Sequence, residues 1–177
     1  DWNSVKFLIV NDGSLVSDSR GLFTFTVVRS PNISGPGYCS IEASSQSRFD
    51  NSSISMHGGS NVCEIVATGA GTGGDDTTMG GAAAHTFECW FRTNSTAVQS
   101  LVTRCSNQQW GGLQIDPASN EIFWGGNVLG TDLIATGVTI NTGTWYHIAA
   151  VVDGNGNAAI YFDGNNVAST SSWSHWN

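Results

Sequence analysis

The chain contains little positive charge and few charged residues of any kind. Of its 177 residues 11% are charged, the formal net charge is -8, and Lys6 is the only lysine. Nucleic acids and anionic membranes are bound through clustered Lys and Arg, so this composition disfavours both as partners. No apolar run approaches the length of a membrane-spanning helix.

Cysteines are few, and their spacing is not that of a metal site. The four of them, Cys39, Cys63, Cys89 and Cys105, include no CxxC pair and allow three disulfide connectivities. A bridge between Cys39 and Cys63 stays open. Cys89 is interpreted as a small buried hydrophobic residue, because it alternates with two phenylalanines.

Helical periodicity is also lacking, since no window keeps a helical period for three turns. Residues 85–92 instead alternate with a period of two, which is typical of a half-buried strand. One set is Phe87, Cys89 and Phe91, and the opposite set is Thr86, Glu88, Trp90 and Arg92. Residues 146–152 are apolar at nearly every position, which predicts a strand covered on both faces.

Turn signals separate the apolar runs. Asp153-Gly154 and Asp163-Gly164 lie between strand-like segments, where Asp-Gly is a strong hairpin signal. Further short strands are predicted at Leu101–Cys105, Leu113–Ile115, Glu121–Trp124 and Val138–Ile140. Short strands at hairpin spacing, in a chain of this length, predict an all-β fold: a two-sheet antiparallel sandwich forming a single domain over residues 1–177.

Four motifs carry a resemblance to a known family: HTFECWFR at 85–92, WGGLQI at 110–115, GTWYHIAAVVDG at 143–154 and AIYFDG at 159–164. Their order resembles the laminin-G-like, concanavalin A-like jelly roll family, close to its pentraxin-like branch. The resemblance implies a binding sandwich rather than a reaction. In this pattern Trp90 and Trp145 are expected to serve packing.

The first residues of the chain resemble the opening of that family, whereas the last residues do not resemble its close. Residues 4–14, leading into Asp18-Ser19-Arg20-Gly21, resemble the opening strand and turn of laminin-G-like modules in phage tail and fibre proteins. The family's usual closing strand is not visible at 172–177. Either that strand has diverged, or the chain is cut short, or a neighbouring chain completes the sheet at an exposed edge.

The expected core follows from the alternation and the resemblance together. Its members should be mostly buried between two antiparallel sheets: Phe87, Cys89, Phe91, Trp145, Ile148, Val151, Ile160 and Phe162.

The carboxylates do not form the pattern of a sugar-cleaving enzyme. Glycosidases on this fold carry two acids on one strand as E-x-D-x-x-E, and no such triplet occurs here. Glu88 is alone in its strand, and the histidines show no HExxH arrangement. We therefore expect no enzymatic activity and keep a glycosidase as the less favoured alternative.

Two tryptophans beside amide-rich loops are candidates for ligand binding. Trp110 follows Asn107, and Trp124 precedes Asn127, so each combines a flat indole with hydrogen-bonding amides, as a glycan site requires. If a glycan is bound there, one of the two indoles should have a ring face open to solvent. A role in the core is the alternative for both.

Calcium is the cation that the acidic loops favour. It takes hard oxygen ligands, and the loop holding Asp12 and Asp18 sets two carboxylates around a Gly-Ser turn. These two residues are the predicted metal ligands. Asp153 and Asp163 are instead interpreted as turn residues that serve the backbone.

Two classes of function remain open from the sequence. The first is a non-catalytic binding module, extracellular or on a virion surface, that recognises carbohydrate or a cell-surface receptor. The second is a structural or decoration protein of a fibre or capsid that uses the sandwich for contacts with other protein subunits. Neither class involves nucleic acid or a membrane.

Overall fold

The computed structural model divides the chain into two compact units, residues 1–76 and 77–177. It describes residues 9–11, 16–18, 23–29, 39–43, 48, 52–56, 63–69, 84–106, 109–126 and 133–173. All assigned elements within these ranges are strands, and none of the described residues belongs to a helix. Accordingly, no described helix is long and apolar enough to cross a membrane. The prediction of one domain over residues 1–177 stays a prediction.

The first unit is described as three antiparallel strand pairs, β1 with β2, β3 with β6 and β4 with β5. Their bounds are β1 Ile9–Asn11, β2 Val16–Asp18, β3 Phe23–Arg29, β4 Cys39–Ala43, β5 Ser52–Met56 and β6 Cys63–Gly69.

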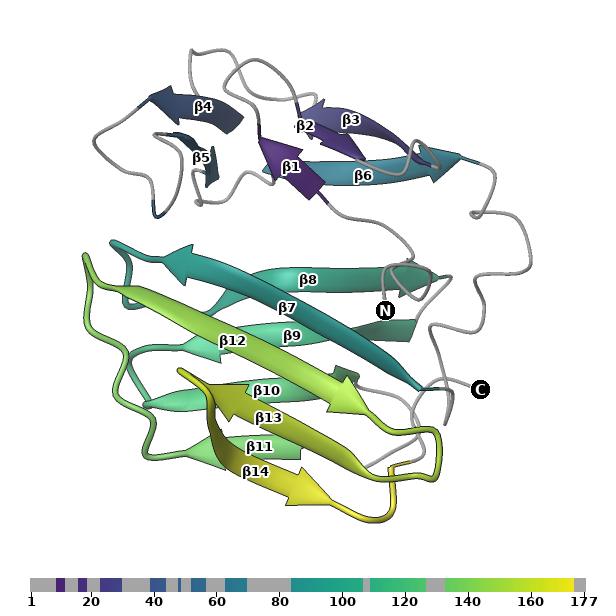
Figure 1. Cartoon of the computed structure of the whole chain (residues 1–177). Coiled ribbons are helices and arrows are strands. Elements are labelled where there is room, and N and C mark those ends of the chain that lie inside the picture. Colours follow the sequence, from purple (N-terminus) through teal and green to yellow (C-terminus); the bar gives the residue numbers. More distant parts are fainter. Residues whose placement is uncertain are drawn as a thin grey trace. The chain divides into compact units, whose positions relative to one another are not determined.

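The second unit is a sandwich of two four-stranded antiparallel sheets. One sheet has the order β14-β13-β12-β7 and the other β11-β10-β9-β8, and Figure 1 shows them as two layers. Their strands are β7 His85–Arg92, β8 Gln99–Ser106, β9 Gln109–Asp116, β10 Glu121–Gly126, β11 Leu133–Thr136, β12 Trp145–Val152, β13 Ala158–Phe162 and β14 Asn165–Thr170. The predicted fold class, an all-β two-sheet sandwich, is confirmed.

The turn between β13 and β14 follows from its sequence. Asp163 and Gly164 have φ angles of 47° and 80°, so both central residues adopt left-handed conformations, as a tight type I′ hairpin requires. The predicted Asp-Gly hairpin is confirmed here. A bulge between Ile160 and Tyr161 shifts the register of this strand pair.

The loop between β12 and β13 is held together by one carboxylate. Asp153 accepts hydrogen bonds from the backbone nitrogens of Asn155 (2.7 Å) and Asn157 (3.1 Å), and from Asn157 Nδ2 (2.6 Å). The Trp173 nitrogen donates to the Gly156 carbonyl at 2.7 Å, which fixes the end of the described chain to this loop. Asp153 therefore has the backbone-supporting role that the turn motif predicted.

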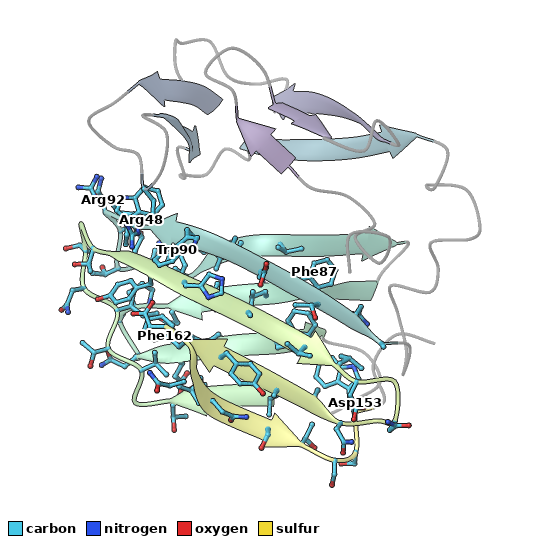
Figure 2. The ribbon with its side chains drawn as sticks, in the orientation of Figure 1. Arg48, Phe87, Trp90, Arg92, Asp153 and Phe162 are labelled. Atoms are coloured by element: carbon cyan, nitrogen blue, oxygen red, sulfur yellow. The ribbon has the colours of Figure 1, made fainter. Side chains whose placement is uncertain are left out.

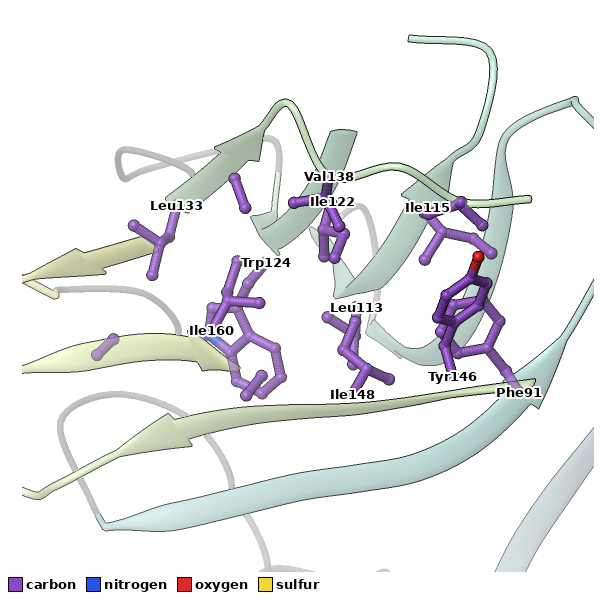
Figure 3. Close-up of a cluster of buried hydrophobic side chains, with 14 of the residues drawn as sticks. Phe91, Leu113, Ile115, Ile122, Trp124, Leu133, Val138, Tyr146, Ile148 and Ile160 are labelled. Atoms are coloured by element: carbon purple, nitrogen blue, oxygen red, sulfur yellow. The ribbon is translucent and has the colours of Figure 1, made fainter. Parts of the chain in front are cut away.

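The core lies between the two sheets and consists mainly of aliphatic residues (Figure 3). On β12 the buried positions 146, 148, 150 and 152 share one face, because successive side chains alternate across a strand. Three members of the predicted core, Phe91, Ile148 and Ile160, are buried in this cluster. Three more are partly buried and pack against it: Phe87, Cys89 and Phe162.

Two members of the predicted core were placed on the wrong face. Trp145 and Val151 occupy the alternate positions of β12 and are half-buried on the outer face of the sheet. The strand was expected to be covered on both faces, but of its outer positions only Ala149 is buried, and positions 145, 147 and 151 are partly covered. An unbroken apolar run therefore did not indicate burial on both sides.

A predicted strand at Val138–Ile140 is also wrong. The strand in this region is β11, and it ends before Gly137, whose φ of 75° breaks the extended backbone. Val138 and Ile140 are nevertheless buried, and the Val138 nitrogen donates to the Asn120 carbonyl at 3.1 Å. The alternation that suggested a strand reflects two side chains that enter the core from an irregular segment.

β14 is the last strand that the structure describes. The expectation about a missing closing strand, and its completion by a neighbouring chain, stays a prediction.

Candidate functional site

The outer face of the β14-β13-β12-β7 sheet carries a row of aromatic and charged side chains. On β7, the side chains of Phe87, Cys89 and Phe91 face the core. Glu88, Trp90 and Arg92 therefore share the outer face. Trp90 is 38% exposed, which makes it one of the large exposed hydrophobic residues in the described part of the chain. Figure 2 shows Trp90 and Arg92 along the same strand. Trp90, which the resemblance predicted to serve packing, is thus partly exposed while its ring still contacts that of His147.

Cross-strand pairing places an imidazole beside this indole. Trp90 and His147 are direct partners in the register of β7 and β12, and their rings lie 5.2 Å apart at an angle of 51°. Glu88 is the diagonal neighbour of His147, with 3.9 Å between Glu88 Oε2 and His147 Nε2. The Glu88 side chain is 66% exposed, and that of His147 is 27% exposed. An aromatic surface, an imidazole and a solvated carboxylate thus lie together.

Backbone contacts fix the end of β7 next to this cluster. Arg92 Nε donates to the Gly143 carbonyl at 2.8 Å, and the Gly143 nitrogen donates to the Thr93 carbonyl at 2.8 Å. Thr93 is buried, and its hydroxyl lies 2.7 Å from Gln99 Nε2. The guanidinium is therefore held at the rim of the face, two residues along the strand from Trp90.

The hairpin residue Asp163 positions His147 from the other side. Its nitrogen donates to the His147 carbonyl at 2.9 Å, and its Oδ1 accepts from the His147 nitrogen at 2.8 Å. The side chain thereby extends the strand pairing by one residue past Phe162. Asp163 acts on the backbone, as the turn motif predicted, and it holds the strand segment that carries the imidazole.

Cys89 lies on the inner side of β7, beneath the outer-face residues. It is a free cysteine that packs against the core. Burial, followed by the nearby Glu88 carboxylate, raises the pKa of the Cys89 thiol to about 11. The thiol is therefore protonated at neutral pH and behaves as a small apolar side chain, as predicted, although it is partly rather than fully buried.

Trp124, one of the two tryptophans proposed from the sequence, lies in the core. It is 2% exposed, and its ring packs against those of His85, Phe87 and Trp173 at 5.4 to 5.9 Å. With no ring face open to solvent, it does not meet the condition set for a stacking residue. The reason is its phase on β10, where Ile122 and Trp124 face the opposite sheet.

The other predicted site residues lie outside the part of the chain whose side chains are described. Trp110 belongs to β9 and Asp18 to β2 by their backbones alone, and Asn107, Asn127 and Asp12 are outside the described residues altogether. Glycan binding by Trp110, Asn107 and Asn127, and cation binding by Asp12 and Asp18, stay predictions. Among the described residues, no group of three or more His, Cys, Asp or Glu side chains is arranged to hold a metal ion.

Comparison with protein families agrees with this architecture. Residues 67–177, more than half of the chain, match a laminin G-type family model described as the concanavalin A-like lectin/glucanases superfamily. The chain belongs to this family. The match covers both sheets of the sandwich. The second unit therefore has a laminin-G-like fold and, in general terms, is a lectin-like binding module.

Finer assignments do not follow from that membership. No curated protein and no solved structure matches the chain. The pentraxin-like branch and the phage tail or fibre context remain predictions. The family's description names lectins and glucanases together, so it does not choose between binding and hydrolysis.

Proposed function

We propose that this laminin-G-like protein is a non-catalytic, carbohydrate-binding module, and that saccharides bind on the outer face of the β14-β13-β12-β7 sheet. The observation that carries the proposal is the exposed Trp90 indole between Glu88 and Arg92 on one strand. Alternate residues of a strand lie about 7 Å apart, which is close to the width of a pyranose ring. A sugar stacked on Trp90 therefore has a carboxylate at one side and a guanidinium at the other.

The side chains around Trp90 supply complementary hydrogen-bonding groups. A carboxylate accepts from sugar hydroxyls, a guanidinium donates to them, and an imidazole can do either. Glu88, Arg92 and His147 provide these three chemistries next to the indole. Such a small set of polar groups around an apolar surface is the composition of ligand sites in general. The setting for such a module is extracellular or on a virion surface.

We propose no catalytic role for this face, because its described acids have other roles. Asp163 binds the backbone of His147, and Glu88 lies beside an imidazole on an open strand rather than in an apolar pocket. A glycosidase acid needs an environment that keeps it protonated near neutral pH. Hydrolysis of a polysaccharide by the purified protein would contradict this part of the proposal.

A glycan array tests the function, with and without calcium and with two matched variants. Trp90→Ala should reduce binding at least tenfold, because it removes the stacking surface. Ile134→Ala is the control, since Ile134 is a 43% exposed hydrophobic residue on the other sheet and its loss should leave binding unchanged. Calcium-dependent binding that survives Trp90→Ala would place the site elsewhere, at the loop of Asp12 and Asp18.

The structural or decoration role, with contacts to other protein subunits, is the alternative function. It predicts no saccharide binding, together with an interface of at least about 1,000 Å² in the assembled particle.

A further inference from the structure

The charges around Trp90 bear on which saccharides this face accepts. This inference rests on the proposed function and concerns the chemical class of the ligand. Glu88 lies two residues from Trp90 on the same face of β7, and its carboxylate accepts no hydrogen bond from another described residue. Because its side chain is 66% exposed, the carboxylate can reach a ligand bound on this face.

Arg92 flanks Trp90 on the side away from Glu88. Arg92 Nε is already used by the Gly143 carbonyl at 2.8 Å, which fixes the guanidinium at the rim. Asp163 adds a second carboxylate on the far side of His147. The strands and hairpin of this sheet therefore bring two carboxylates, those of Glu88 and Asp163, and one guanidinium, that of Arg92, to the neighbourhood of His147. The chain as a whole carries -8, so long-range attraction does not favour anions either.

We propose that Glu88 is a specificity-determining residue that selects uncharged and amino-bearing saccharides and rejects carboxylated and sulfated ones. A sugar stacked on Trp90 brings its substituents within a few ångströms of the Glu88 carboxylate. An acidic substituent there meets a like charge, whereas a hydroxyl or ammonium group donates to the carboxylate. Discrimination comes from this repulsive element as much as from attraction.

Binding of matched saccharide pairs tests the inference. The probes are neutral oligosaccharides that bind the wild-type protein, the same oligosaccharides carrying a terminal sialic acid or sulfate, and glucosamine oligomers. Wild-type protein should bind the acidic member about fivefold or more weakly than its neutral partner, the scale expected of a like-charge contact near 4 Å in water. Raising the salt concentration should reduce this difference in affinity between the neutral and the acidic saccharide.

Two substitutions separate a local effect from a change in net charge. Glu88→Gln keeps the shape and a hydrogen-bonding oxygen, and it should reduce the preference for neutral sugars at least threefold while also weakening binding of glucosamine oligomers. Glu121→Gln removes one negative charge from β10 in the other sheet and should leave the preference unchanged.

The outcomes distinguish this inference from the proposed function. If the wild-type protein binds neutral and acidic partners equally, or if Glu88→Gln and Glu121→Gln behave alike, the selectivity is overturned while Trp90-dependent binding stands. If the wild-type protein binds no saccharide at all, the proposed function fails, and the selectivity fails with it.

Discussion

Replacing Trp124 by alanine separates a core tryptophan from a ligand-binding one. Trp124 is 2% exposed and packs against three aromatic rings. Burying an indole removes about 200 Å² from water, which at about 25 cal/mol per Å² contributes about 5 kcal/mol. Its Nε1 is buried with no hydrogen-bond partner among the described residues. That unpaired group costs about 1–2 kcal/mol, so Trp124→Ala should lower the free energy of unfolding by about 3–4 kcal/mol.

Thermal unfolding followed by circular dichroism measures this loss. For a chain of this size, 1 kcal/mol shifts Tm by about 2–4 °C, so Tm should fall by about 6–16 °C. Ile134→Ala is the control, because Ile134 is 43% exposed on the outer face of β11 and the loss of its smaller, half-exposed side chain should cost about 1 kcal/mol. Equal Tm values for the two variants, or a Trp124 variant as stable as the wild type, would refute the assignment of inner and outer faces.

Further predictions concern two side chains with shifted pKa values. Burial raises the pKa of the Cys89 thiol to about 11, so iodoacetamide at pH 8 should label it only after denaturation, as measured by peptide mass spectrometry; equally fast labelling of the native protein would contradict its burial. Hydrogen bonds, first that from the Asn157 side chain, lower the pKa of Asp153 below 3.8. Because the folded-state value is the lower one, the carboxylate stabilises its loop above pH 3.8, and this contribution is lost as pH falls through the folded pKa. A carbon-13 NMR titration of the Asp153 carboxyl should give a midpoint below 3.8, and a midpoint at or above that value would show that these bonds do not persist in solution.

The sheet architecture could be predicted because it rests on local signals. Alternation in β7 and the Asp-Gly hairpin at Asp163 each depend on a few adjacent residues, and both are confirmed. The boundary at Gly137 was missed, because Val138 and Ile140 enter the core from irregular backbone. Periodicity records which side chains are buried, and it does not record whether the backbone between them is extended.

The candidate site was predicted less well, for a reason that one residue illustrates. The alternation of β7 already put Trp90 opposite Phe87, Cys89 and Phe91, but the family resemblance suggested that it packs. The pairing of Trp90 with His147 depends on the register of two strands more than 50 residues apart in the sequence, which no local pattern specifies. Trp124 shows the converse, because an amide-rich loop after a strand does not reveal which face the preceding indole occupies.

The most direct measurement is a titration of the protein with a saccharide taken from the glycan array, followed by proton–nitrogen NMR of the tryptophan indoles. We expect the Trp90 indole signal to shift in a saturable way, while the signals of the buried Trp124 and Trp173 stay in place. A saccharide that binds without moving the Trp90 signal, or that shifts the core indoles instead, would contradict the assignment of the outer face as the binding site.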